Sequence, residues 1–243
     1  MKKFYDLCLQ APLSDFGLVE RMVTKAVWLG YSGVGIPLPY DVSNVAVSRL
    51  RQICADSGID LVTRINLAPK SVNELLSQLR RCRRRFEIIG VSCIHKAVAR
   101  QAAKDRRVDL LSFPELNFRN RYFDDAEAEL AAGSLASLEI DMSMLLSANS
   151  FERIHLLAQL RRETTIASKF SVPIVLSSGA KNESLMRKPR DFAALAYLFD
   201  MPSASALRTI SENPSSIFTR NRTKLHSSFV APGIRIVKRG KDC

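Results

Sequence analysis

The stretch VPIVLSSGAKNESLMRKPRD, residues 172–191, combines an apolar run, a Ser-Ser-Gly break and four cations around a proline. The cations are Lys181, Arg187, Lys188 and Arg190. Pro189 is typical of the first turn of a helix, where the helix dipole disfavours cations by about 0.3 to 1 kcal/mol each. A bound anion would offset this cost, and helix amino termini bind phosphate through free N–H groups. We therefore predict a phosphate-contacting loop at Ser177, Ser178 and Gly179.

Two acids in the same stretch offer a simpler interpretation. Glu183 and Asp191 could pair with neighbouring cations, and the remaining cations would then be solvated. The sequence leaves both interpretations open, although a phosphate group accounts better for the whole cluster.

Glu139 and Asp141 lie two residues apart in the apolar run SLEIDM. Side chains repeat every second residue along a strand, so both carboxylates point to one face. A catalytic carboxylate needs an acid or base partner, and the sequence provides no clear one. A structural role is the better interpretation: an inward carboxylate that accepts hydrogen bonds or pairs with Arg64.

The sequence contains no spacing typical of a metal site. His95, His155 and His226 are far apart, and no other ligand-type residue stands beside them in a hydrolytic pattern. His155 is interpreted as a packing residue and His226 as solvated. The five cysteines are odd in number and form no CxxC pair, which indicates reduced thiols and a cytoplasmic protein.

The basic residues are concentrated in two segments. The net charge of the chain is +12; residues 80–107 carry a net +8 and residues 220–243 a net +6. Five arginines fall within six positions in the run RRCRRR, residues 80–85. Capping of a helix carboxyl terminus explains part of this run, and a solvated face is the alternative. Arginine is twice as frequent as lysine, and guanidinium groups pair bidentately with phosphate, so structured RNA is the expected partner.

Short apolar runs alternate with amphipathic segments along the chain. The expected strands are residues 4–9, 32–37, 61–67, 88–94, 108–113, 137–142 and 173–178. The expected helices are residues 15–29, 43–57, 71–83, 95–104, 149–170, 189–200 and 203–212. Continuous apolar strands that alternate with helices predict an α/β fold with about seven parallel strands.

A closed barrel is favoured over an open sheet. LQAPLS follows the first apolar run where an open sheet would often have GxGxxG, and GxxxxGK[ST] does not occur. We predict one TIM-like (β/α) barrel domain over residues 1–222 and a flexible basic tail over residues 223–243. No apolar stretch is long enough to span a membrane, so no membrane partner is expected.

The order of several segments resembles the ribonuclease P protein component 3 family of archaea and eukaryotes. The segments are FYDL, RVDLLSFP, SLEIDMSMLL, VPIVLSSGA, MRKPRDFAALAYLFDM and ISENPSSIFTRNR, within residues 4–222. The resemblance implies a TIM-like barrel related to polymerase-and-histidinol-phosphatase (PHP) barrels. It implies an RNA-binding subunit for 5′ maturation of precursor tRNA, in which the RNA subunit performs the Mg²⁺-dependent hydrolysis. It further implies a small ferredoxin-like protein partner, contact with precursor tRNA only through the complex, and no cofactor on the protein itself.

By motif position the resemblance assigns RNA contact to Arg107, Lys181, Arg187 and Arg190. Spacing alone adds further cations: Lys188, Arg64, Lys96, Arg80, Arg81, Arg83, Arg84 and Arg85. The related metal phosphoesterases carry Asp-x-His-x-His after the first strand, whereas Asp6 here is followed by Cys8 and Gln10. Glutamine is a poor metal ligand, so the metal site of those enzymes is not expected.

Two other functions stay open at this level. A barrel enzyme for a small phosphorylated substrate would use Asp141, Lys181 and Arg187, and its turnover would respond little to charge reversal at residues 80–85. A protein-interaction adaptor would use exposed aromatic residues in 115–125. Phe118, Tyr122 and Phe123 could instead cover the end of the barrel.

Overall fold

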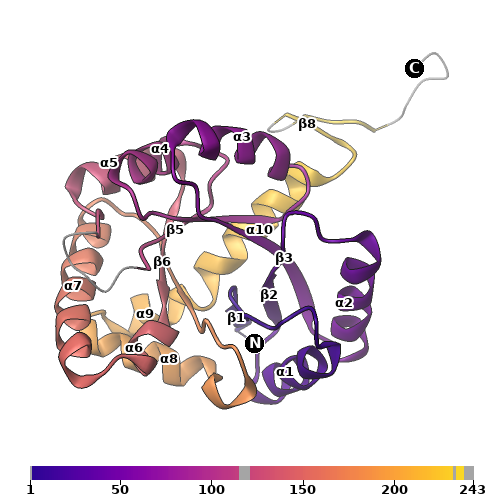
Figure 1. The fold of residues 1–243 in the computed structure, drawn as a ribbon, viewed down its shortest axis with the longest axis horizontal. Coiled ribbons are helices and arrows are strands. Elements are labelled where there is room, and N and C mark those ends of the chain that lie inside the picture. The colour runs from indigo at the N-terminus through magenta and orange to yellow at the C-terminus, as the bar shows by residue number, and fades with distance from the viewer. Residues whose placement is uncertain (1, 115–120, 232–233, 238–243) are drawn as a thin grey trace.

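A computed structural model describes residues 2–114, 121–231 and 234–237. The described residues form a seven-stranded sheet of parallel strands in the order β1-β2-β3-β4-β5-β6-β7 (Figure 1). The strands are β1 (Tyr5–Asp6), β2 (Gly33–Pro37), β3 (Asp60–Leu67), β4 (Ile88–Ser92), β5 (Leu110–Ser112), β6 (Ser137–Asp141) and β7 (Ile174–Ser177). All seven predicted strands are confirmed.

The sheet curls into a nearly closed barrel whose seam lies between β1 and β7. Leu9 and Ala180 form an isolated parallel bridge across the seam, and the Gln10 N–H donates to the Ala180 carbonyl at 2.8 Å. The Asp6 carboxylate also crosses the seam, because it accepts from the Ser178 N–H at 3.0 Å. The barrel prediction is therefore confirmed.

Helices connect the strands and cover the outside of the barrel. They are α1 (Phe16–Leu29), α2 (Asn44–Asp56), α3 (Val72–Cys82), α4 (Lys96–Lys104), α5 (Asp125–Ser134), α6 (Met142–Ser147), α7 (Ser150–Lys169), α8 (Pro189–Leu195), α9 (Ser203–Thr209) and α10 (Glu212–Leu225). The predicted capping box of α7 is present: the Asn149 side chain accepts from the Glu152 N–H, and the Glu152 carboxylate accepts from the Asn149 N–H. Helices α5, α6 and α10 were not predicted.

Helix α10 closes the amino-terminal end of the barrel. Ile217 and Phe218 belong to the apolar cluster inside the barrel, and the Phe218 ring packs edge-on against Tyr5 at 4.9 Å between centroids. The other side chains of this cluster are Leu7, which directly follows β1, and the strand residues Val62, Ile88, Leu110 and Val175. The helix thus completes the core as well as covering it.

The chain continues beyond the predicted domain boundary at residue 222. Helix α10 runs to Leu225. A short antiparallel pair follows, β8 (Phe229–Ala231) with β9 (Ile234–Arg235). The predicted flexible tail therefore contains described secondary structure, whereas residues 232–233 and 238–243 lie outside the described part. Within the described ranges, no helix has the length and apolar character needed to cross a membrane.

Candidate nucleic-acid interface

Arg64 lies inside the barrel, so its assignment to RNA contact is corrected. Its side chain is 2% exposed, and its two terminal nitrogens donate to the Glu139 carboxylate at 2.5 and 2.6 Å. The guanidinium also donates to Asn66 and to the Leu7 carbonyl. Gly90 makes room for it, because a Cβ there would stand 3.1 Å from Arg64 Nη2. The predicted structural role of Glu139, paired with Arg64, is confirmed.

The predicted phosphate loop is also corrected. Ser177 and Ser178 are 1% exposed. The Ser177 hydroxyl donates to Glu139 at 2.5 Å, and the Ser178 hydroxyl accepts from the Ala180 N–H at 3.1 Å. Gly179 has φ +59°, and a Cβ there would stand 2.0 Å from an oxygen of Asp141. The loop therefore faces carboxylates and the seam, and its hydroxyl groups have partners inside the protein.

The carboxyl end of the barrel does not form a substrate pocket at Asp141. The carboxylate caps α6 by accepting from the Ser143 N–H at 2.9 Å. The cavity beside it has a volume of about 10 Å³, which is room for about one water molecule. Burial raises the pKa of Asp141, and neighbouring Glu139 raises it further. This geometry does not suit a phosphorylated substrate.

The residues at the end of the first strand do not fit a metal ion. Asp6 is 3% exposed, and its carboxylate accepts from the N–H groups of Cys8 and Ser178. Burial raises the pKa of the Cys8 thiol to about 12, so it is a thiol rather than a thiolate ligand near neutral pH. Within the described ranges, no group of three or more His, Cys, Asp or Glu side chains could hold a metal ion.

The basic segment 80–107 surrounds β4, and part of its charge is paired internally. Arg83 donates to Asp109 at 2.6 Å, and Arg107 binds Asp105 with contacts of 2.9 and 2.6 Å. Arg100 binds Asp124 and Glu127. The side chains of Arg83 and Arg107 are 18% and 31% exposed. RNA contact by these two residues stays a prediction, and only a small part of each side chain is accessible for it.

The remaining cations of this segment are exposed. We define the β4 set as the exposed cations of this segment at the ends of α3 and α4: Arg80, Arg81, Arg84, Lys104 and Arg106. Within the described ranges, none of them forms an ion pair with a carboxylate. Arg85 is also exposed but lies over the Tyr40 ring and donates to the Tyr40 carbonyl. Lys96 is exposed at the start of α4.

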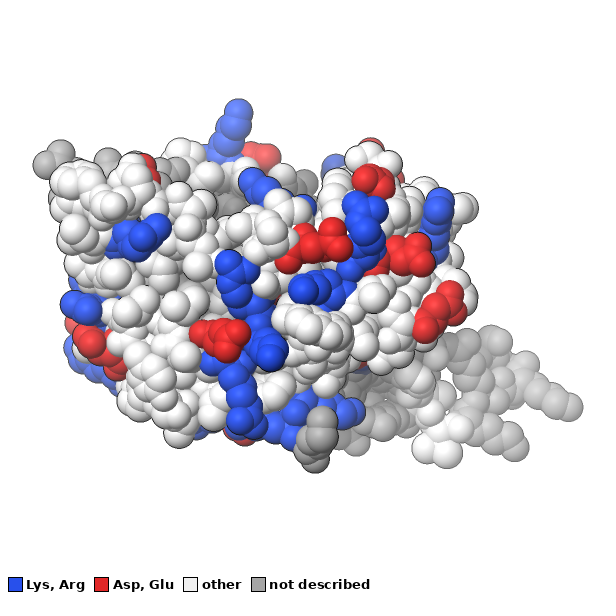
Figure 2. Space-filling model, turned by 90° about the horizontal axis from the view of Figure 1, so that it is seen from below, with Lys and Arg blue, Asp and Glu red and all other residues white. Residues whose placement is uncertain are grey.

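The cations of the opening stretch are exposed beside α1. We define the seam set as Lys181, Arg187, Lys188 and Arg190. Pro189 is the first residue of α8, as predicted. Glu183 binds Arg21 of α1 at 3.4 Å instead of a seam cation. Asp191 forms no described ion pair, so the simpler interpretation of local pairing is not supported. Figure 2 shows this side of the molecule, with Lys and Arg side chains across its centre and acids beside them.

The aromatic residues proposed for an adaptor surface belong to the core where they are described. Phe123 is 2% exposed and packs edge-on against Phe113, and Tyr122 is half-buried against the core. Phe118 lies outside the described residues. His155 is exposed and packs its ring edge against Phe151, and His226 is exposed as predicted.

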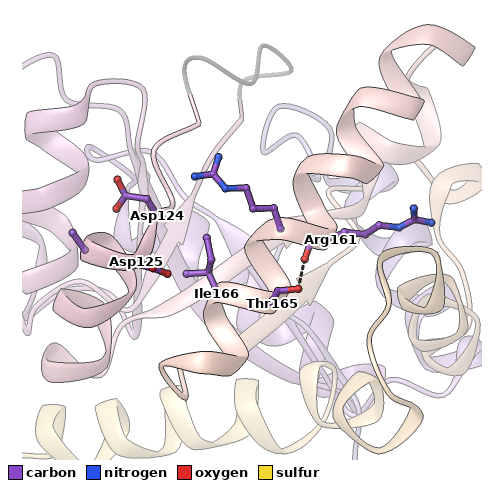
Figure 3. A pocket seen from close by; sticks show the side chains of 7 residues that line it. Asp124, Asp125, Arg161, Thr165 and Ile166 are labelled. Atoms are coloured by element: carbon purple, nitrogen blue, oxygen red, sulfur yellow. Dashed lines mark hydrogen bonds between the residues drawn. The ribbon is translucent and has the colours of Figure 1, made fainter.

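A pocket of about 640 Å³ lies between the start of α5 and α7 (Figure 3). Acids and arginines face it together, and Asp124 is already bound to Arg100. The Arg161 guanidinium points away from Asp124 and donates to the Leu198 carbonyl at 3.0 Å. The described side chains around this pocket do not bring an unpaired acid and an unpaired base to the same place in it. The pocket therefore does not indicate an active site.

Sequence reasoning missed the role of the arginines in α10. Arg222 binds Asp60 at 2.7 Å and also contacts Glu87, and Arg220 donates to Asp109 at 3.1 Å. These bonds tie the helix to the amino-terminal ends of the strands. Arg220 and Arg222 therefore stabilise the fold, although the charge pattern alone suggested that this segment contacts RNA.

The amino-acid sequence of this chain is similar to those of known proteins. Ribonuclease P protein component 3 of Methanosarcina barkeri is 28% identical over 241 residues, which cover 98% of this chain and 97% of that protein. Its counterpart in Methanosarcina mazei is 26% identical over 240 residues, with 99% and 98% coverage. Both relatives match this chain over nearly their whole length.

Solved structures share the fold. A chain in a cryo-EM structure of archaeal ribonuclease P with mature tRNA has a TM-score of 0.82 at 22% identity, covering 98% of this chain and 99% of that one. A probable 2-pyrone-4,6-dicarboxylic acid hydrolase from Acinetobacter baumannii has a TM-score of 0.54 at 10% identity, with 89% and 99% coverage. The family model of RNase P subunit p30 matches residues 3–226. The chain therefore belongs to the RNase P subunit p30 family.

Proposed function

We propose that this chain is the RNA-binding protein subunit of ribonuclease P and supports the catalytic RNA in 5′ maturation of precursor tRNA. The protein performs no hydrolysis in this proposal. The RNA holds the Mg²⁺ ions, precursor tRNA is reached through the complex, and the complex works in the cytoplasm. The cavity beside Asp141, which is too small for a substrate, supports the absence of protein-based chemistry.

One observation carries the proposal: within the described ranges, the exposed arginines and lysines of the β4 set and the seam set have no carboxylate partners, whereas the buried arginines of the barrel are paired with carboxylates. Surface cations without carboxylate partners attract a polyanion, and each phosphate that they neutralise releases counterions. Affinity should therefore fall steeply with salt. The contacts are expected to go to the RNA backbone rather than to bases, because no described element presents an aromatic stacking motif.

The protein partner in this proposal is a small ferredoxin-like subunit, which the family resemblance implies. Exposed apolar side chains on α7 provide a surface for it. Phe151 is 72% exposed and Ile154 is 67% exposed. Replacement of both by Ser should weaken co-purification of the two proteins without unfolding the barrel, because neither side chain contributes to the core. Unchanged co-purification would assign the partner to another surface.

Reconstitution tests the function. Wild-type protein is combined with its ribonuclease P RNA and the small partner, and precursor-tRNA cleavage is measured at limiting Mg²⁺. A Lys188→Ala, Arg190→Ala variant should cleave at least several-fold more slowly, with partial recovery at high Mg²⁺. A Lys70→Ala, Arg162→Ala variant is the matched control, since both of these side chains are also exposed. Cleavage of RNA by the isolated protein, or equal rates for all three proteins, would contradict the proposal.

A further inference from the structure

The two sets of exposed cations lie on opposite sides of the barrel. The strand order places the seam between β1 and β7, so the middle strand, β4, lies across the barrel from the seam. The β4 set stands at the ends of the two helices that flank β4, and the seam set follows β7. Figure 1 shows α3 and α4 along one edge of the molecule and α1 and α8 along the opposite edge.

The separation is large compared with the reach of surface electrostatics. A compact domain of this length has a diameter of roughly 45 Å. The Debye length at physiological ionic strength is about 8 Å. Charges in one set therefore contribute almost nothing to the potential at the other. A straight RNA helix that contacts one side cannot contact the other at the same time.

The β4 set is crowded, which makes a purely solvated role unfavourable. Lys224 at the end of α10 adds a further cation to this region. Partial burial and the neighbouring charges of Arg220, Arg83 and Arg106 lower the pKa of Lys224. Repulsion among these cations is relieved when phosphate groups lie over them.

The wall between the two sets on the α5 side carries acids. Asp125 and Glu129 of α5 are exposed; Asp125 binds Lys169 at 2.9 Å, and the neighbouring Asp124 binds Arg100. A phosphate backbone that followed this wall would meet the carboxylate of Glu129 and acids whose cations are already paired. The two sets are therefore better suited to two separate RNA segments than to one backbone that passes from one to the other along this side.

We propose that the protein is a bridge: the seam set binds one RNA segment, the β4 set binds a second, and the barrel holds the two segments apart at a fixed distance. The bridge rests on the proposed function, because it requires that the partner is RNA. It adds that one protein molecule organises two distant parts of the same RNA.

Hydroxyl-radical protection of the ribonuclease P RNA, at one protein per RNA, tests the bridge. The seam variant carries Lys181→Glu, Lys188→Glu and Arg190→Glu. The β4 variant carries Arg80→Glu, Arg84→Glu and Arg106→Glu. Arg187 is left unchanged because its guanidinium donates to the carbonyls of Ser184 and Met186 and so supports the loop. The control variant, with Lys70→Glu, Arg162→Glu and Arg208→Glu, has the same charge change at other exposed positions.

Wild-type protein should protect two separate RNA segments. Each variant should lose one segment and keep the other, and the control should keep both. Loss of three phosphate contacts should also lower the slope of log affinity against log salt by about 2 to 3.

Two results would overturn the bridge while leaving RNA binding intact: loss of the same segment in both variants, or a variant that behaves like the control. Absence of any protection by the wild-type protein would instead contradict the proposed function. Circular dichroism and thermal unfolding confirm that each variant is folded, so that lost protection reports on contact.

Discussion

Two groups of cationic residues in this protein differ in whether a carboxylate lies beside them. Arg64, Arg121 and Arg222 face carboxylates of the barrel and its helices. The β4 set and the seam set face solvent and have no carboxylate partner within the described ranges. The first group holds the fold together, whereas the second group is available to a polyanion. A net charge of +12 therefore does not say how much of the surface serves RNA.

Loss of the carboxylate inside the barrel should have the largest effect on stability. Glu139→Gln would leave the Arg64 guanidinium buried without a negative partner, which costs about 3 to 5 kcal/mol of unfolding free energy. Urea denaturation measures the change. The double variant Arg64→Met, Glu139→Leu should recover most of the loss, because it removes both charges. A cost below about 1 kcal/mol for the single variant would mean that the Arg64–Glu139 pair does not stabilise the barrel.

The contact between α10 and the barrel should give the next largest effect. Asp109 is 1% exposed and accepts from Arg83, Arg220, Asn221 and the Ile89 N–H. Asp109→Asn removes the charge from these hydrogen bonds and should cost about 2 to 3 kcal/mol. Hydrogen exchange should show the amides of α10 losing protection more than those of α3. Equal loss in both helices would mean that Asp109 stabilises the barrel as a whole.

Glu127 binds Arg100 of the basic segment 80–107, and its contribution to the stability of the protein depends on pH. Its side chain is fully buried; Oε2 binds Arg100 at 2.8 Å, while Oε1 has no partner within the described ranges. Burial raises the pKa of Glu127 to about 7, although Arg100 lowers it. The unfolded chain has a lower pKa, so the folded protein binds more protons between about pH 4.5 and 7. The stabilising contribution is therefore complete below about pH 4.5 and is lost as pH rises through about 7.

Glu127→Gln should remove this dependence. The variant should be more stable than the wild type by roughly 1 to 3 kcal/mol at pH 8 and about equal to it near pH 4.5. Thermal unfolding across this pH range measures the difference. If the difference between the two proteins stays constant with pH, ion pairing with Arg100 outweighs burial.

The exposed cations should have the smallest effect on stability. Arg84→Ala and Lys188→Ala should each change the unfolding free energy by less than about 0.5 kcal/mol. Each should lower the salt dependence of RNA affinity by about 0.7 to 0.9 in slope if the side chain contacts one phosphate. Filter binding at several salt concentrations provides the measurement. If a variant is destabilised and its salt slope is unchanged, the replaced side chain supports the fold and does not contact a phosphate.

Local sequence patterns predicted most of the fold. The seven strands are short apolar runs, and α7 begins at its predicted capping box. Helix α10 is not predicted from the sequence, because Pro214 interrupts the helical pattern. Pro214 lies in the first turn, where its missing N–H needs no partner within the helix. Helix α5 is not predicted either, because its buried positions include small residues such as Ala128 and Ala131, so its buried face is only slightly more hydrophobic than its exposed face.

The candidate interface was only partly predictable, because exposure and ion pairing depend on residues far apart in the chain. Arg64 and Glu139 are 75 positions apart; strand periodicity predicts that Glu139 and Asp141 point to one face, and pairing with Arg64 is one of the two structural roles that it leaves open for them. Arg222 pairs with Asp60 across 162 positions, and no local pattern indicates that contact. Ser177 and Ser178 looked available because the sequence does not show that their loop turns into the seam.

The sequence by itself determined the alternation of strands and helices, the family and the excess of positive charge, because these follow from residue type and local periodicity. Only the tertiary structure decided which cations are free, because barrel closure brings distant acids to some arginines and leaves others at the surface. It also decided that the free cations lie on two sides, since the position of a segment around a closed sheet depends on strand order rather than on its own residues.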